Sequence, residues 1–215
     1  MQYRIVNRKN EVCPARPNMS ATEEKVKRLS DVILALLGLV LLSPLYIILT
    51  PILALKWKGR PFFTQERVGK GGRIFRILKF RTMSPDVETE SMQLTVEGDA
   101  RVDGFSRFLR RHHLDELPQL WNVLRGDMSM VGYRPEQPCF VQRIMEEDCR
   151  YEWLLAMRPG VTSEATLYNG YTDTMEKMLV RLNMDLQYME TASLQRDWLI
   201  MLKTIGVLFN DKSSK

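Results

Sequence analysis

Residues 32–55 read VILALLGLVLLSPLYIILTPILAL, an unbroken run of 24 uncharged residues between Asp31 and Lys56. At ~1.5 Å per residue, a straight helix of this length would measure ~36 Å, longer than the ~30 Å hydrocarbon core of a bilayer. The run therefore indicates a helix that enters a membrane. A buried helix of a water-soluble domain fits its length and purity poorly.

Two proline-containing pairs interrupt this run, Ser43-Pro44 at its midpoint and Thr50-Pro51 nearer its end. Proline removes one backbone N–H and clashes with the preceding turn, which costs ~3 kcal/mol or more inside a helix. In lipid the freed carbonyl needs another donor, for which the Ser43 hydroxyl is a candidate. We expect the helix to break at Ser43 and Pro44 into two halves, each about one leaflet deep.

Both ends of the run carry positive charge. Lys25, Lys27 and Arg28 precede it, and Lys56, Lys58 and Arg60 follow it. Short segments rich in Lys and Arg stay on the cytoplasmic side, so both ends favour the same side of a membrane. A helix that enters, bends and returns satisfies both ends, whereas a kinked spanning helix satisfies one. Because the positive-inside rule is a bias, the residues alone leave both arrangements open.

The net charge of +5 is spread unevenly over the 215 residues. Residues 1–31 carry +3 and residues 56–81 carry +8, whereas the remainder carries −6. A basic belt beside an apolar helix attracts anionic lipid headgroups, at ~1 kcal/mol per residue near the surface, and it equally attracts phosphorylated substrates. We rank nucleic acid last among the partners, because a membrane element and an acidic remainder both oppose it.

The cysteines and histidines argue against several kinds of site. The three cysteines are an odd number without CxxC spacing, which disfavours a disulfide framework or a structural zinc and suits a reducing cytosol. His112 and His113 are the only histidines. Adjacent side chains on a helix point ~100° apart, so these two cannot easily share one metal. We interpret them as surface residues, with phosphate contact as the alternative.

The rest of the chain mixes short strands and helices. Residues 61–63 and 73–80 alternate at period two around a glycine-rich turn, which predicts a β-hairpin and lacks the GK[ST] ending of a P-loop. Residues 127–132 predict a short strand, and residues 84–103 predict a mobile acidic loop. We expect helices over residues 105–111, 140–157, 174–190 and 192–209.

Asp115 and Glu116 form the acidic pair of the candidate site. Asp115 is predicted to cap a helix that has Pro118 in its first turn and closes near Leu124, before Gly126. An ionised aspartate can attack phosphorus, and a neighbouring carboxylate can bind a divalent cation. Acidic residues are also commonplace at helix N-termini, so the pair alone does not decide the function.

Basic residues lie at the ends or turns of the predicted elements. They are Lys79, Arg81, Arg110, Arg111, Arg134 and Arg158. Arginines that converge on an acidic pair are typical of a polyphosphate site, where guanidinium groups and a metal hold the transferring group. For any one of these residues, and for Arg111 in particular, a solvated surface position is the alternative.

The chain resembles the bacterial sugar transferases, the small membrane-embedded polyprenyl-phosphate phosphoglycosyl transferases that start glycan assembly. The resemblance covers about residues 25–205 and includes the Ser43-Pro44 break. It rests on KFRTM (79–83), LDELPQLWNVL (114–124), GDMSMVG (126–132), Arg134-Pro135 and RPGVT (158–162).

The resemblance implies a reaction and a set of roles. Asp115 would attack the β-phosphate of a nucleotide sugar, usually UDP-linked, releasing UMP and forming an aspartyl-phosphosugar. Polyprenyl (undecaprenyl) phosphate would then accept the phosphosugar. Glu116 would take part in catalysis and hold Mg²⁺. The residues implied to bind substrate are Lys79, Arg81, Arg110, Arg134 and Arg158.

The resemblance also implies a place and an architecture. The fold would be α+β and mostly helical, with a polar tail (1–24), a re-entrant membrane helix broken at Ser43-Pro44 (25–56) and a membrane-associated catalytic domain (57–215). The protein would act on the cytoplasmic face of a bacterial inner membrane, at the first membrane step of capsule, exopolysaccharide or O-antigen synthesis. Homo-oligomerisation is left open.

Two segments depart from the family pattern. Residues 132–135 read GYRP where the family usually has GPRP, and residues 163–166 read SEAT where it usually has GWAQ. Both lie where nucleotide or sugar contacts are expected, so the identity of the sugar stays open. A nucleotide-sugar pyrophosphatase would turn over without lipid. A non-enzymatic, membrane-anchored lipid-binding adaptor would release no UMP.

Overall fold

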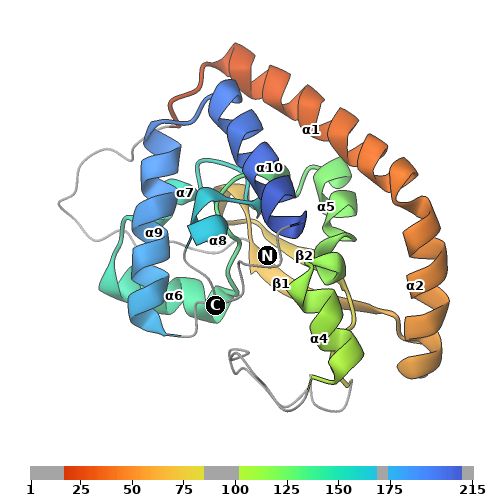
Figure 1. Cartoon of the computed structure of the whole chain (residues 1–215). Helices are drawn as coiled ribbons and strands as arrows, with labels where there is room; N and C mark the ends of the chain where they lie inside the picture. The colour runs from red at the N-terminus through yellow and green to blue at the C-terminus, as the bar shows by residue number, and fades with distance from the viewer. Residues whose placement is uncertain (1–16, 85–101, 169–173, 210–215) are drawn as a thin grey trace.

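The computed structural model describes residues 17–84, 102–168 and 174–209, and this part of the chain is mostly helical with two small two-stranded sheets (Figure 1). The predicted combination of helices with a small β-hairpin is therefore confirmed. Most of the predicted N-terminal tail and of the predicted acidic loop lies outside the described residues.

The first described helix is α1 (Ala21–Leu41), which starts with a capping box. The Glu23 N–H donates to the Ser20 hydroxyl at 3.2 Å, and the Ser20 N–H donates to the Glu23 carboxylate at 2.8 Å. This reciprocal pair satisfies two backbone donors that a helix N-terminus would otherwise leave open. The helix thus begins at Ala21, four residues before the boundary at residue 25 expected from the sequence.

The helix breaks where the sequence predicts. Leu42 separates α1 from α2 (Ser43–Lys56), and the two helices are bent by 64°. Pro44 lacks the N–H that would bond to the Val40 carbonyl four residues earlier. The Ser43 hydroxyl donates to that same carbonyl at 2.7 Å. Pro51, in contrast, lies inside α2 and does not end it.

Helices α1 and α2 form a bent arm along one outer side of the molecule (Figure 1). None of the described helices is long and apolar enough to cross a membrane alone. Taken together, α1 and α2 have the length and the apolar composition to do so. The exposed side chains of the arm are largely apolar: Leu29, Leu36, Leu37, Val40, Leu41, Ile47, Ile48 and Leu55.

The inner face of α1 is tied to the domain by buried charges. The Asp31 carboxylate accepts the Ser129 hydroxyl at 2.8 Å and the Met130 N–H at 3.0 Å, both from β3 (Ser129–Val131). Lys27 pairs with Asp197 of α10 (Leu194–Phe209). We call these contacts of Lys27 and Asp31 the α1 clamp. They fix the orientation of the arm relative to the rest of the molecule.

The predicted hairpin is confirmed: β1 (Phe62–Val68) and β2 (Ile74–Phe80) pair antiparallel and are joined by a 3-10 turn, η1 (Lys70–Gly72). Helix α5 (Gln119–Arg125) lies against β2. Its Asn122 side chain accepts the Leu78 N–H at 2.9 Å and donates to the Arg76 carbonyl at 2.8 Å. These bonds set the distance between the hairpin and the start of α5.

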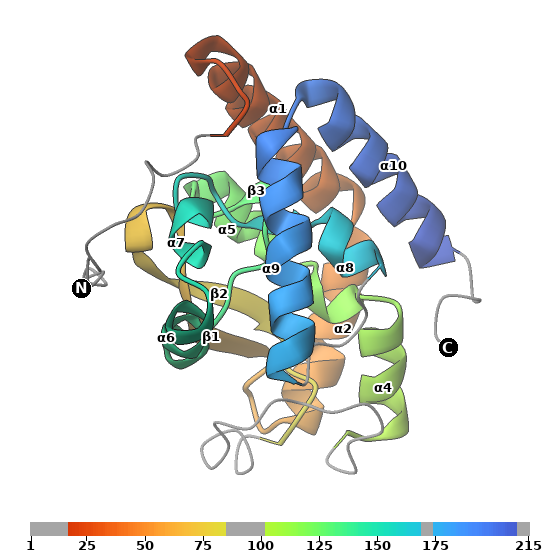
Figure 2. The same cartoon turned by 90° about the vertical axis from the view of Figure 1, so that its left-hand side faces the viewer.

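The other helices are α4 (Gly104–Arg111), α6 (Pro138–Glu147), α7 (Tyr151–Leu154), α8 (Glu164–Tyr168) and α9 (Met175–Glu190). The prediction of one helix over residues 140–157 is wrong. Asp148 has an extended backbone, and its carboxylate accepts the Arg150 N–H at 3.0 Å. This local bond competes with helical bonding and separates α6 from α7. Helix α9 runs across the middle of the domain, with α6 and α7 on one side and α8 and α10 on the other (Figure 2).

Gly132 and Gly160 let two segments of the chain pack backbone against backbone beside the core. Strand β4 (Gly160–Thr162) pairs parallel with β3, and the Gly160 N–H donates to the Tyr133 carbonyl at 2.8 Å. A Cβ on Gly132 would lie 2.4 Å from the Arg158 carbonyl oxygen, and one on Gly160 would lie 2.1 Å from the Gly132 nitrogen. Both neighbours are backbone atoms, so neither position has room for a side chain.

We predict that Gly132→Ala lowers the free energy of unfolding by about 3 kcal/mol or more, because the added methyl overlaps backbone that cannot move away. Gly104→Ala is the control, since a Cβ there meets open space at the start of α4. It should shift stability by less than about 0.5 kcal/mol. Chemical unfolding in detergent micelles measures both. Equal stability of the two variants would contradict this close backbone contact.

Candidate active site

The turn between α4 and α5 carries the acidic pair. His113 has a left-handed backbone (φ 52°), and η2 (Leu114–Glu116) follows it as a single 3-10 turn. Helix α5 starts only at Gln119, with Pro118 at its N-cap and no side-chain cap bond. The prediction that Asp115 caps this helix is therefore wrong. Its carboxylate instead lies among cations.

Glu116 is held by two basic side chains from different parts of the chain. Its Oε1 accepts Lys79 Nζ of β2 at 2.5 Å and an Arg134 guanidinium nitrogen at 3.3 Å. Its side chain is only 12% exposed. Burial alone would raise the pKa of Glu116, but the charges of Lys79 and Arg134 more than offset it and lower the pKa well below its ordinary value. Glu116 is therefore a carboxylate held ionised.

Asp115 lies beside Glu116 and is buried. Burial and the adjacent Glu116 charge raise its pKa, while Lys79 and Arg110 act in the opposite direction. Arg110 is itself fixed, because its Nε donates to the hydroxyl of buried Thr82 at 2.8 Å. The two carboxylates thus share one set of cations, and Glu116 makes the direct contacts.

This donor set fits magnesium better than a metal that needs an all-protein cage. Among the described residues there is no group of three or more His, Cys, Asp or Glu side chains placed to hold a metal. Mg²⁺ keeps several waters and is commonly bound by one or two carboxylates together with substrate phosphates. Both described ion pairs of Glu116 end on Oε1.

The family model described as "Bacterial sugar transferase" matches residues 22–211. This chain belongs to the bacterial sugar transferase family. The match contains every described element from α1 to α10 apart from the first residue of α1. The expectation drawn from the sequence motifs is confirmed at the level of the family.

Curated members of the family are similar over most of this chain. It is 39% identical over 201 residues to the UDP-glucose:undecaprenyl-phosphate glucose-1-phosphate transferase of Caulobacter vibrioides, covering 91% of this chain and 74% of that protein. It is 38% identical over 183 residues to the UDP-N-acetylgalactosamine-undecaprenyl-phosphate N-acetylgalactosaminephosphotransferase of Aeromonas hydrophila, covering 85% of this chain and 43% of that protein. The chain thus spans less than half the length of the Aeromonas relative.

The family motifs do not all meet at the acidic pair. Lys79, Arg110 and Arg134 surround it, as described above. Arg81 lies at the end of the hairpin, where its guanidinium donates to the carbonyls of Arg60 (2.9 Å) and Phe62 (3.0 Å). Arg111 is exposed, in line with the surface alternative.

Arg158 lies at the opposite end of α5. Its Nε donates to the Gly126 carbonyl at 3.1 Å, and its charge lies close enough to Arg28 of α1 to lower the pKa of Arg28, after burial as the main cause. Arg28 donates to the carbonyls of Val123 (2.7 Å) and Leu124 (3.0 Å). Arg28 and Arg158 together satisfy the carbonyl end of α5. This is a structural task that the spacing of the motifs did not predict.

The two segments that depart from the family pattern have defined structures. Tyr133 is fully buried and makes an edge contact with Tyr151, with ring centroids 6.3 Å apart. Ser163 caps α8 through the Thr166 N–H at 2.9 Å, and Glu164 pairs with Arg196 of α10. The side chains of Ser163 and Glu164 thus hold α8 and tie it to α10.

Four charged residues behind Arg134 escaped the sequence analysis. They are Arg67, Glu136, Arg181 and Asp185, all buried or nearly so. Glu136 bridges Arg67 (3.4 Å) and Arg181 (3.3 Å). The signal in the sequence was on α9, where Arg181 and Asp185 interrupt the apolar stripe formed by Met178, Leu182, Leu186 and Met189. A charged residue on a core-facing stripe needs a buried partner.

Asp185 gives a pH-dependent prediction. Burial, together with the Glu136 charge, raises its pKa to about 8, although Arg181 acts in the opposite direction. The groups that face it are Arg181, Arg134, Glu136, Tyr133 and Tyr151. The pKa of an aspartate in the unfolded chain is near 3.8. Between pH 3.8 and about 8, the folded protein therefore keeps Asp185 protonated while the unfolded chain has lost that proton. This contribution to stability is present at low pH and is lost as the pH rises toward about 8.

We therefore expect Asp185→Asn, which cannot ionise, to gain thermal stability relative to the wild type as the pH is raised from about 5 to about 8. Thermal unfolding of both proteins in the same detergent at each pH measures the difference in Tm. A difference that stays constant over this range would contradict the raised pKa.

Proposed function

We propose that this protein transfers a sugar 1-phosphate from a UDP-sugar to undecaprenyl phosphate. The observation that carries the proposal is the buried Asp115 beside a Glu116 whose charge is held by Lys79 and Arg134. This arrangement suits an anionic polyphosphate and a carboxylate nucleophile. The activities for which the Caulobacter and Aeromonas relatives are named are of this kind.

In the proposed reaction, a carboxylate oxygen of Asp115 attacks the sugar-bearing phosphorus. The bond from that phosphorus to the bridging oxygen breaks, and UMP leaves with the electron pair. The product is an aspartyl-phosphosugar. A phosphate oxygen of the polyprenyl phosphate then attacks the same phosphorus, which regenerates the Asp115 carboxylate and yields a polyprenyl diphosphate sugar. Arg110 and Arg134 stabilise the charge that develops on the phosphoryl oxygens.

Glu116 is the residue proposed to hold Mg²⁺, with Asp115 beside it. The cation would neutralise diphosphate charge when bound. Lys79 keeps Glu116 ionised and oriented in the meantime. Arg81 and Arg158 remain substrate-binding candidates from the family resemblance, although their described contacts lie outside the acidic pair.

We further propose that α1 and α2 enter and leave the same face of a bacterial inner membrane, with the domain on the cytoplasmic side. The 64° bend, the apolar outer face of the arm and the basic residues at both of its ends support this placement. It would bring the site to the headgroup layer, where the phosphate of a polyprenol lies. The reaction would open the assembly of a capsule, exopolysaccharide or O-antigen.

The nucleophile is tested with Asp115→Asn. UMP release should fall by at least about 1,000-fold, because an amide cannot form the acyl phosphate. The measurement is UMP release from a panel of UDP-sugars with Mg²⁺ and undecaprenyl phosphate. Asp103→Asn is the matched control, since Asp103 caps α4 and asparagine caps a helix equally well. It should stay within about threefold of the wild type.

Full activity of Asp115→Asn would remove Asp115 as the nucleophile. Omitting the lipid separates the two alternatives from the transferase. A pyrophosphatase would turn over many times without lipid, whereas a transferase would release at most one UMP per active site and keep a labelled phosphosugar on the protein. A lipid-binding adaptor would release no UMP with any donor in the panel.

The membrane arrangement is tested with single cysteines at Lys25 and Arg60 in a background without the native cysteines. Both side chains are exposed and flank the bent arm. Lys58 is avoided because its backbone is left-handed (φ 51°). An impermeant thiol reagent should reach both positions only from the cytoplasmic side of membrane vesicles. Labelling from opposite sides would establish a spanning helix instead.

A further inference from the structure

Thr82 lies in the segment KFRTM (79–83), which begins in β2 and continues past the end of that strand. The backbone just before Thr82 is bonded on both sides. The Arg81 N–H donates to the Pro61 carbonyl at 2.8 Å, and the Trp57 indole donates to the Arg81 carbonyl at 3.0 Å. Thr82 itself is 5% exposed. It is therefore a buried residue at a fixed point of the hairpin end.

The Thr82 hydroxyl binds the side chain of Arg110 on α4. Arg110 Nε donates to it at 2.8 Å, the distance of a charge-assisted hydrogen bond. With the described residues, the Arg110 guanidinium makes no other hydrogen bond or ion pair. A guanidinium is planar, so a bond at Nε fixes its plane and leaves the fork of its two terminal nitrogens for another ligand.

Two backbone hydrogen bonds bring Arg110 next to the acidic pair. The His113 N–H donates to the Arg110 carbonyl at 3.1 Å, and the Glu116 N–H donates to the His113 carbonyl at 3.2 Å. The chain therefore turns back within a few residues of α4. The charge of Arg110 also acts to lower the pKa of Asp115, as expected for a cation at this place. A phosphate attacked by Asp115 would meet the free fork of Arg110.

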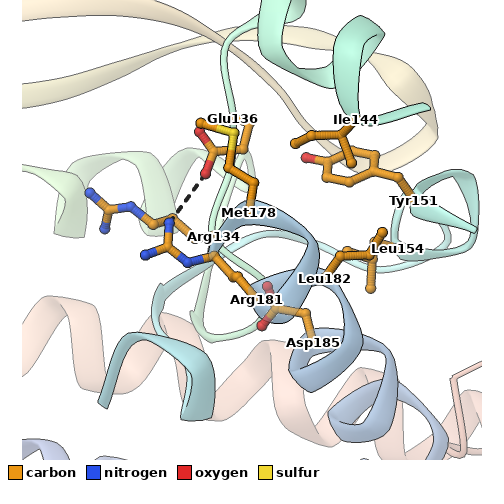
Figure 3. A pocket seen from close by; sticks show the side chains of 9 residues that line it. All are labelled: Arg134, Glu136, Ile144, Tyr151, Leu154, Met178, Arg181, Leu182 and Asp185. Atoms are coloured by element: carbon orange, nitrogen blue, oxygen red, sulfur yellow. Dashed lines mark hydrogen bonds and ion pairs between the residues drawn. The ribbon is translucent and has the colours of Figure 1, made fainter. Parts of the chain in front are cut away.

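Arg134, the other arginine at the acidic pair, is supported in a different way. Its guanidinium binds the Glu116 carboxylate at 3.3 Å. Two residues later, the Glu136 carboxylate binds Arg181 of α9 at 3.3 Å, an ion pair that Figure 3 shows beside Arg134. For Arg110, the Thr82 hydroxyl is the described group that orients the guanidinium. The two arginines thus depend on separate parts of the fold.

Packing alone does not require a hydroxyl at position 82. Valine has nearly the same shape as threonine and would fill nearly the same space. A buried hydroxyl costs free energy unless it is hydrogen-bonded, and the described partner of this hydroxyl is Arg110. The bond to Arg110 therefore accounts for a threonine here better than core packing does.

We propose that Thr82 is a positioning residue that orients the Arg110 guanidinium toward the donor phosphate attacked by Asp115. This inference rests on the proposed function, because it assigns Arg110 to the phosphoryl oxygens of that reaction. Without the hydroxyl, the long Arg110 side chain would move among several rotamers. A hydrogen bond to a charged group is worth about 10- to 100-fold in an equilibrium constant, and its loss should lower the rate by a similar factor.

The test compares two variants of Thr82 by UMP release with Mg²⁺, undecaprenyl phosphate and the UDP-sugar that gives the highest wild-type rate. Thr82→Val keeps the shape but lacks the acceptor, and its kcat/KM for the UDP-sugar should fall by about 10- to 100-fold. Thr82→Ser keeps the hydroxyl and should stay within about threefold of the wild type. Thr64→Val is the matched control, because Thr64 is exposed on β1 of the same hairpin. It should also stay within about threefold.

A double-mutant cycle separates positioning from a general effect on folding. In an Arg110→Ala background, Thr82→Val should cost less than about threefold, because the guanidinium through which Thr82 acts is gone. Losses of the same size in both backgrounds would overturn the proposal, and so would equal activities of Thr82→Ser and Thr82→Val. Failure of Thr82→Val to fold, measured by thermal unfolding, would show a structural requirement and would overturn it as well. A folded wild type that is inactive with the whole donor panel would contradict the proposed function instead.

Discussion

The α1 clamp is the contact on which the arrangement of the molecule depends. Asp31 and Lys27 are nearly withdrawn from water, and their partners come from β3 and α10. Removing either Lys27 or Asp197 would leave the other charge nearly buried without its partner, which costs several kcal/mol. An apolar arm joined to a domain by apolar contacts alone could slide or rotate. The directional hydrogen bonds of Asp31 to β3 hold α1 in one orientation.

The clamp also connects the arm to the site through α5. Helix α1 packs on α5, and Arg28 binds the carbonyl end of that helix. The other end of α5 follows the turn that carries Asp115 and Glu116. This short helix is held at one end by α1, and along its side by the hairpin through Asn122, so it connects the position of the arm to that of the acidic pair.

Much of this arrangement could be predicted from local chemistry. The missing N–H of Pro44 dictated the break, and the period of two dictated the hairpin. The predicted Asp115 cap was wrong because the Asp115 carboxylate lies near cations instead of at the N-terminus of α5. The predicted helix over residues 140–157 was wrong because the Asp148 carboxylate accepts the Arg150 N–H, which interrupts helical bonding. The places of Arg158 and of the buried Arg181–Glu136 pair depend on contacts between distant segments, which no spacing in the sequence encodes. The acidic pair was identifiable because its residues are neighbours in the chain.

The close backbone contact between Gly132 and Gly160 bears on the order in which the protein folds during synthesis. The two glycines stand on either side of α6 and α7, so that whole excursion must be made before the chain can close on itself. Helix α9, which supplies Asp185, comes later still. During synthesis the apolar arm leaves the ribosome before α9 does, so Glu136, two residues after Arg134, gains its buried partner Arg181 only later. The apolar arm is thus complete well before the charged group behind Arg134 can form.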